Sequence, residues 1–125
     1  MATNTDTGRM GEFLASYILE TYGVEVHHVD RAGADLWCRA NNAIVTVQVK
    51  SARQPARSND HTQSVYYSYL TKNPNADWYC FVALDRQLLL MRKTAEITTS
   101  TVRIAPSEFN EANQRRTVEQ LLKPA

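Results

Sequence analysis

The stretch "DLWCRANNAIVTVQVKSA", residues 35–52, predicts a β-hairpin that continues into a long strand. Asn41-Asn42 is a suitable two-residue turn, because asparagine tolerates the positive φ angles that such turns require. Beyond the turn, three valines alternate with polar residues that include Gln48 and Lys50. Successive side chains of a strand point to opposite faces, so Gln48 and Lys50 share one face and the valines share the other. A central strand normally packs apolar side chains on both faces, so the polar face needs an explanation.

The register of this hairpin adds a carboxylate to the polar face. With the asparagine pair as the turn, counting outward places Asp35 opposite Gln48, and their Cβ atoms are expected about 5 Å apart. Lys50 lies one step further along the same face. The cluster is either a solvated face of an edge strand, where an exposed Asp–Lys pair contributes at most about 1 kcal/mol, or a catalytic site. The hairpin alone leaves both interpretations open.

Composition and charge set broad limits on the protein. The chain has 125 residues, with 43% apolar and 22% charged side chains, which predicts one globular domain over residues 1–125. A net charge of +1 excludes a histone-like excess of basic residues but permits a local basic patch. Cys38 and Cys80 lie in apolar runs without a CxxC or Cys/His motif, so we expect buried thiols and no zinc site. No apolar run approaches a membrane span and no signal core is present, which favours a cytoplasmic protein.

Residues 7–22 predict an amphipathic helix, and residues 24–29 predict the first strand. Glu12 lies at the border between the polar and apolar faces of that helix. The side chains expected to face the core are Met10, Phe13, Leu14, Tyr17 and Ile18, and those expected on the polar face are Arg9, Ser16 and Glu20.

The rest of the chain predicts a loop over 51–63, a strand over 64–71 with a helix as the alternative, and a central strand over 78–84. A further strand is expected over 88–92. The tail, 106–124, predicts one or two short helices, with a capping box at Thr117 and Gln120. The order of helix, three strands, loop, strands and helix predicts an α/β or α+β domain.

The polar cluster has the chemistry needed to hydrolyse a phosphodiester bond. Asp35 is a hard oxygen ligand of the kind that Mg²⁺ prefers, and Gln48 can add an amide oxygen. Lys50 can orient a water molecule or neutralise the charge of a phosphate.

Three short motifs in order, "GE" at 11–12, "GAD" at 33–35 and "QVK" at 48–50, resemble the PD-(D/E)XK nuclease superfamily. The match spans residues 8–52, and "ADWYCFVAL" at 76–84 resembles the core strand that follows in that superfamily. The resemblance implies an α/β, restriction-endonuclease-like core in which helices flank a mixed β-sheet.

The resemblance also implies a role for each residue of the cluster. Asp35, Gln48, the main-chain carbonyl of Val49 and Glu12 are expected to bind Mg²⁺, for which Mn²⁺ can substitute. Lys50 is expected to serve the attacking water. The superfamily more commonly has Asp or Glu at the position of Gln48, so this site has one negative charge fewer. Glu12 is then the other carboxylate expected to help Asp35 bind the metal.

The implied function is a Mg²⁺-dependent DNA endonuclease. In its small size and its early helix glutamate, the chain resembles two branches of the superfamily: the compact homing endonucleases and the archaeal-type Holliday-junction resolvases. The sequence does not distinguish between these branches. The alternative is a non-catalytic DNA-binding or scaffold module on a decayed nuclease fold.

DNA contacts are expected beside the cluster, from Arg53, Arg57 and His61 in a flexible basic loop. Because a duplex has two strands and the chain is small, a homodimer or higher homo-oligomer is expected. His27 and His28 are neighbours in a strand and point to opposite faces, so they are not expected to bind one metal ion.

Overall fold

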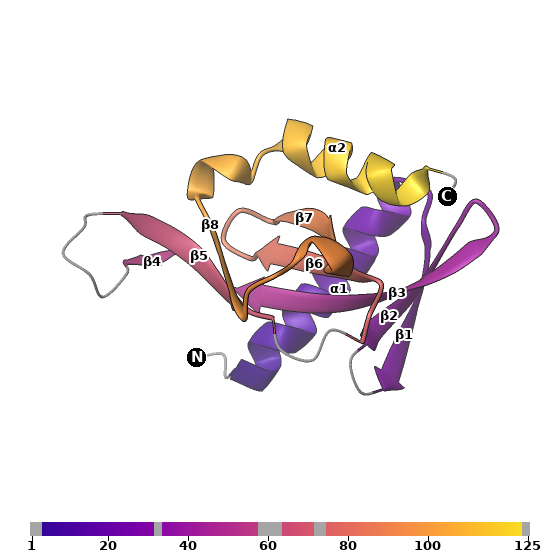
Figure 1. The fold of residues 1–125 in the computed structure, drawn as a ribbon, viewed down its shortest axis with the longest axis horizontal. Coiled ribbons are helices and arrows are strands. Elements are labelled where there is room, and N and C mark those ends of the chain that lie inside the picture. Colours follow the sequence, from indigo (N-terminus) through magenta and orange to yellow (C-terminus); the bar gives the residue numbers. More distant parts are fainter. Residues whose placement is uncertain (1–3, 32–33, 58–63, 72–74, 124–125) are drawn as a thin grey trace.

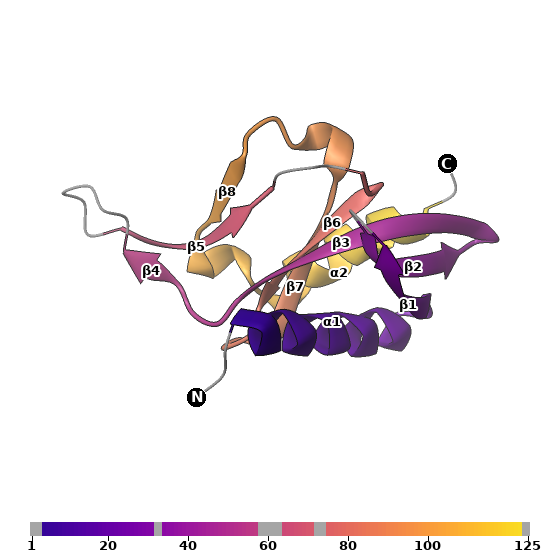
Figure 2. The ribbon, with the colours of Figure 1, turned by 90° about the horizontal axis from the view of Figure 1, so that it is seen from below.

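The protein has an α/β fold, shown by the computed structural model in Figures 1 and 2. The structure describes residues 4–31, 34–57, 64–71 and 75–123. The elements within these ranges are α1 (Asn4–Thr21), β1 (Glu25–Arg31), β2 (Ala34–Ala40), β3 (Ala43–Ala52), β4 (Ala56–Arg57), β5 (Val65–Leu70), β6 (Trp78–Ala83), β7 (Leu88–Lys93), β8 (Thr101–Ile104) and α2 (Glu111–Leu122), with short 3₁₀ turns at Thr94–Glu96 and Pro106–Glu108.

Five strands form a mixed sheet in the order β1-β2-β3-β6-β7. β3 and β6 are parallel, and the other neighbours are antiparallel. A smaller antiparallel sheet has the order β4-β5-β8. The expected architecture, a mixed sheet flanked by helices, is confirmed, and β3 is a central strand rather than an edge strand.

The main sheet separates two hydrophobic cores. The helix-side core joins α1 and α2 to Val47 and Val49 of β3 and to alternate residues of β6 and β7. The strand-side core joins β5 and β8 to Tyr79 and Phe81 of β6. Figure 2 shows α1 on one side of the sheet and β5 with β8 on the other.

The hairpin between β2 and β3 has the register predicted from its turn. Asn41 and Asn42 have φ angles of 52° and 65°, which are the positive values that a tight hairpin turn needs. Ala40 pairs with Ala43, and Arg39 pairs with Ile44. Local turn chemistry was therefore sufficient to align the two strands.

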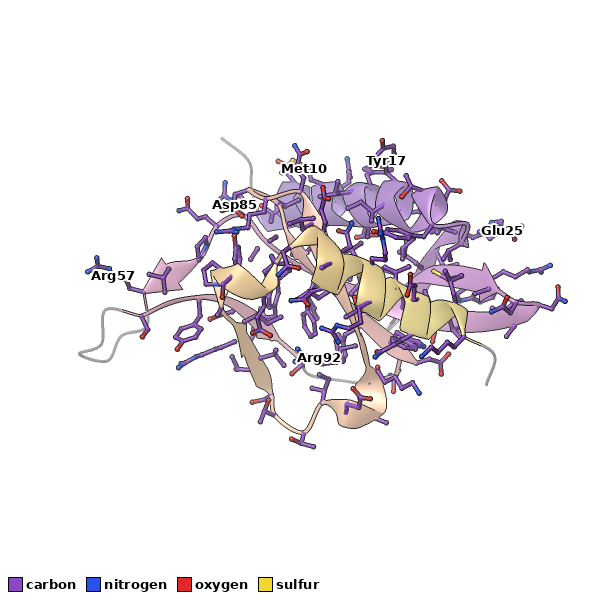
Figure 3. All side chains as sticks on the ribbon, turned by 90° about the horizontal axis from the view of Figure 1, so that it is seen from above. Met10, Tyr17, Glu25, Arg57, Asp85 and Arg92 are labelled. Atoms are coloured by element: carbon purple, nitrogen blue, oxygen red, sulfur yellow. The ribbon has the colours of Figure 1, made fainter. Side chains whose placement is uncertain are left out.

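The predicted inner face of α1 was partly wrong. Met10, Phe13 and Tyr17 are 43%, 60% and 69% exposed, whereas Ser16, predicted on the polar face, is buried. Figure 3 shows Met10 and Tyr17 on the outer side of the helix. The helix packs through small residues that let it approach the sheet closely, supported by larger aliphatic ones: Gly11, Ala15, Ile18 and Leu19.

Two further expectations need correction, and one strand was not predicted. Ala56–Arg57, inside the predicted loop 51–63, forms the short strand β4 against β5, whereas the strand predicted over 64–71 is confirmed as β5 (Val65–Leu70). β8 was not predicted, because a four-residue strand carries little periodicity. The capping box was wrong: α2 begins after Asn110, whose side chain accepts a hydrogen bond from the Asn113 amide at 2.8 Å.

Thr117 and Gln114 of α2 accept hydrogen bonds from the edge of the main sheet. The Thr117 Oγ1 accepts a hydrogen bond from the Met91 amide at 3.1 Å, and the Gln114 amide oxygen accepts one from the Leu89 amide at 2.9 Å. Both amides belong to β7, the last strand of the sheet. α2 therefore satisfies part of an edge that would otherwise present unpaired donors.

Candidate active site

Asp35 lies at the start of β2 and is held by two groups from β3. Its Oδ2 accepts a hydrogen bond from the side-chain Nε2 of Gln48 at 3.1 Å and another from the main-chain amide of Val49 at 2.9 Å. The backbone pairing of the two strands runs from Ala40–Ala43 to Leu36–Val47. Just beyond that ladder, the Asp35 carboxylate takes the Val49 amide, so the predicted neighbourhood of Asp35 and Gln48 is present in the fold.

Burial dominates the electrostatics of Asp35. Partial removal from water raises the pKa of its carboxyl group, while the hydrogen bond from Val49 and the positive charge of Lys50 act in the opposite direction. Lys50 forms no salt bridge with Asp35 within the part of the chain that the structure describes, so its influence is that of a nearby charge. Among the described side chains, Lys50 supplies positive charge to this carboxylate without a direct ion pair.

The polar face of β3 is a boundary between core and solvent. Gln48 and Lys50 are half-buried, and across the sheet they pair with Tyr79 and Phe81 of β6. Those two rings are fully buried and stack with centroids 5.6 Å apart. The strand-side core reaches β3 at Ala52, and Gln48 and Lys50 lie at its rim beside Tyr79 and Phe81. This placement contradicts the interpretation as a solvated edge strand.

Tyr79 is a feature that the sequence did not reveal as special. Tyr79 lies on β6, where it pairs with Gln48 of β3. Its buried hydroxyl has no hydrogen-bond partner among the described residues. Burial raises the pKa of this hydroxyl. The only signal in the sequence was a hydroxyl-bearing residue within the most apolar run of the chain.

Glu12 approaches from α1. The preceding residue, Gly11, touches β3: a Cβ atom at Gly11 would overlap the Ser51 Oγ and lie 2.7 Å from the Ser51 Cβ. Glu12 is half-buried, and its main-chain carbonyl accepts a hydrogen bond from the Ser16 Oγ at 2.8 Å. The close contact of helix and strand therefore places Glu12 next to the end of the "QVK" segment, on the helix side of the sheet.

The histidines of β1 are separated as expected. His27 contacts Glu25 at 2.9 Å, and His28 contacts the Ser16 Oγ at 3.0 Å through its Nε2. The His28 ring also packs against Phe13, with centroids 5.3 Å apart. His28 thus links β1 to α1.

The predicted DNA-contacting residues lie further along the chain. Arg53 and Arg57 follow β3 in the sequence, and both are exposed. Figure 3 shows Arg57 at one end of the molecule, on β4. His61 lies outside the described residues. The structure therefore groups Asp35, Gln48, Val49 and Lys50 and leaves Arg57 apart from them.

The donors of the site are mostly neutral. Within the described ranges, no group of three or more His, Cys, Asp or Glu side chains gathers as a metal site. The nearby oxygen donors are the carboxylate of Asp35, the amide of Gln48 and main-chain carbonyls.

In the residue ranges that the structure describes, no helix is both long and apolar enough to cross a membrane.

The fold is similar to that of a known nuclease. No family model and no curated protein sequence matches the chain. Among solved structures, the chain is similar to the bacterial homing endonuclease I-Ssp6803I, with a TM-score of 0.73 and 16% sequence identity. The similarity covers 98% of this chain and 93% of the other. The two proteins therefore share an architecture over nearly their whole lengths.

Proposed function

We propose that the protein is a Mg²⁺-dependent DNA endonuclease that hydrolyses phosphodiester bonds. The observation that carries this proposal is the half-buried Asp35, held by Gln48 and the Val49 amide beside Lys50 on a central strand. The similarity in fold to a homing endonuclease supports the same reaction class and favours cleavage at specific sites over junction resolution.

The residues present suit a hard divalent cation. Asp35, the Gln48 amide oxygen and the Val49 carbonyl are the oxygen donors proposed to hold Mg²⁺ or Mn²⁺, whereas Glu12, on the helix side of β3, is not included. The raised pKa of Asp35 supports this assignment, because a partly buried carboxylate is stabilised in its charged form by a cation bound beside it. A bound Mg²⁺ polarises a phosphoryl oxygen and makes a bound water more acidic.

Lys50 has a separate task in this proposal. Its ammonium shares the polar face with Gln48 and Asp35, where it can hold the attacking water or contact a phosphate oxygen. The fully buried rings of Tyr79 and Phe81 lie beside this face and exclude water from one side. A charge at such a boundary acts more strongly on a phosphate than one in bulk water.

A second candidate is a DNA-binding module that no longer cleaves. The observation in its favour is the neutral Gln48, whose amide nitrogen donates to Asp35 and leaves the site with one negative charge fewer than an acidic residue would supply.

The proposed enzyme acts as a homodimer or higher homo-oligomer, since two strands of a duplex must be cut. Met10, Phe13 and Tyr17 support this: they form an exposed apolar ridge, one turn apart along α1, and such patches mark interaction surfaces. Sedimentation equilibrium of the wild type and of Phe13→Ser tests it, and a monomeric wild type would contradict it.

The deciding experiment is nicking of supercoiled plasmid with Mg²⁺, with Mn²⁺ and with EDTA. We expect nicking with either metal and none with EDTA. A parallel comparison of long linear duplexes with four-way junctions separates site-specific cleavage from junction resolution. DNA binding without cleavage in any metal would support the non-catalytic module instead.

A further inference from the structure

The hairpin between β2 and β3 projects beyond the rest of the main sheet. In Figures 1 and 2 its end is the part of the molecule furthest to the right. Pairing of β3 with β6 begins at Val47, Thr46 is hydrogen-bonded to Asp77, and residues 43–45 pair with β2. Asn41 and Asn42, at the tip, are both exposed. A hairpin of this kind has the width that the DNA major groove admits.

Large exposed side chains flank the tip. Ile44 is 57% exposed, and it pairs across the hairpin with Arg39, whose side chain is 54% exposed. The Arg39 Nε lies 3.8 Å from the Glu25 Oε2, a long and exposed ion pair that is easily exchanged for another anion. Glu25 also has a hydrogen bond with His27, which lowers the pKa of the Glu25 carboxyl group. Glu25 therefore has a second partner besides Arg39.

These side chains match the edges of DNA bases. An asparagine amide pairs with adenine, an arginine guanidinium pairs with guanine, and an apolar side chain contacts the methyl group of thymine. The tip therefore has the means to distinguish bases, which backbone contacts alone do not provide.

The other side of the hairpin is suited to the phosphate backbone. A depression of about 620 Å³ lies there, bounded by the hairpin, Trp78 and the end of α2. Lys93 and Lys123 line it together with Glu96, so positive charge is in excess. The Lys93 ammonium lies over the Trp78 ring, 5.8 Å from its centroid. Cations beside a base-reading element fix its position through phosphates.

We propose that the β2–β3 hairpin enters the major groove beside the cleavage site and that Arg39, Asn41, Asn42 and Ile44 read the bases there. The proposal rests on the proposed function. The strand from Gln48 to Ala43 spans about 17 Å at about 3.4 Å per residue. DNA also rises about 3.4 Å per base, so the bases read lie about five base pairs from the scissile phosphate.

The test removes the two amides without changing the turn. Glycine adopts the positive φ of both positions, so Asn41→Gly combined with Asn42→Gly preserves the hairpin. Gln87→Gly is the matched control, because Gln87 is also an exposed amide with a positive φ of 55°, in the β6–β7 turn. Each protein selects duplexes from a randomised library by binding in Ca²⁺, and plasmid nicking in Mg²⁺ is measured beside it.

We expect the double glycine variant to lose discrimination about tenfold or more at bases near five base pairs from the cut, with nicking retained. The control should keep the wild-type preference. Wild-type preference in the double variant, or no base preference in the wild type, would overturn the role of the hairpin while leaving nicking intact. Absence of wild-type nicking would instead overturn the proposed nuclease function, and the binding selection does not depend on cleavage.

Discussion

The two faces of β3 have opposite surroundings, although their residues alternate along one strand. Val47 and Val49 are 0% and 8% exposed and pack in the core formed with both helices. Gln48 and Lys50 lie at the rim of the strand-side core, which covers the neighbouring Tyr79 and Phe81. Residues one position apart can therefore serve stability or chemistry, depending on which layer covers them. Substitutions on the two faces should separate these effects.

The largest expected effect is the loss of cleavage in Lys50→Ala. We expect plasmid nicking to fall at least about 100-fold, because a charge aimed at the reacting phosphate or water is removed. Thermal unfolding and gel-shift binding should change little. Val47→Ala is the matched control from the other face and should lose about 1–3 kcal/mol of unfolding free energy while still nicking DNA. Wild-type nicking by Lys50→Ala would remove Lys50 from the proposed site.

Asp35→Asn should separate metal binding from stability. We expect Mg²⁺ binding, measured by calorimetry, to weaken about tenfold or more, because the main anionic donor is lost. The pKa of Asp35 is raised from its ordinary value of 3.8, so the folded protein binds the proton more tightly than the unfolded chain. The wild type therefore loses unfolding free energy as the pH rises from below 3.8 through the folded pKa.

This pH dependence gives the Asp35→Asn variant a distinctive signature. Without metal, its unfolding temperature should exceed that of the wild type at pH 7, and the difference should vanish below pH 3.8. Equal Mg²⁺ binding by the two proteins would count against Asp35 as a ligand.

Gln48 distinguishes an active site from a decayed one. In an active site, Gln48→Ala should lose most nicking, and Gln48→Glu should tighten Mg²⁺ binding by adding a carboxylate. In a decayed site, the wild type should be inactive and Gln48→Glu should restore some cleavage. Nicking rates as a function of Mg²⁺ concentration for the three proteins decide between these outcomes. Full activity in Gln48→Ala would show that the amide has no role.

A smaller effect is expected where α1 meets β3. Gly11→Ala should cost about 1–3 kcal/mol of unfolding free energy, because the added methyl group overlaps the Ser51 side chain. Adding Ser51→Gly should recover part of the loss, since it removes the atoms that clash. Gly8→Ala is the control, because a Cβ at Gly8 meets no atom within 4 Å. Denaturant unfolding of Gly11→Ala, Ser51→Gly, the double variant and Gly8→Ala measures the coupling, and additive effects would contradict the contact.

Sequence patterns were sufficient to predict the hairpin and the contact between Asp35 and Gln48. The turn at Asn41-Asn42 fixes the register of two adjacent strands, and strand alternation then brings Asp35 to Gln48. These relations are local, so no distant part of the chain is needed to derive them. The central position of residues 78–84 followed similarly from their uniformly apolar character.

The buried face of α1 and the surroundings of the polar face of β3 depend on contacts between distant segments, which local patterns do not reveal. Helical periodicity counts apolar residues and favoured Met10, Phe13 and Tyr17, but the helix is placed by the close contact of Gly11 with Ser51, which composition does not reveal. The half-burial of Gln48 and Lys50 depends on β5 and β8, which lie far along the chain, cover Tyr79 and Phe81 of β6 and reach β3 at Ala52. Burial arises from contacts between distant segments, and those contacts set the electrostatics of Asp35.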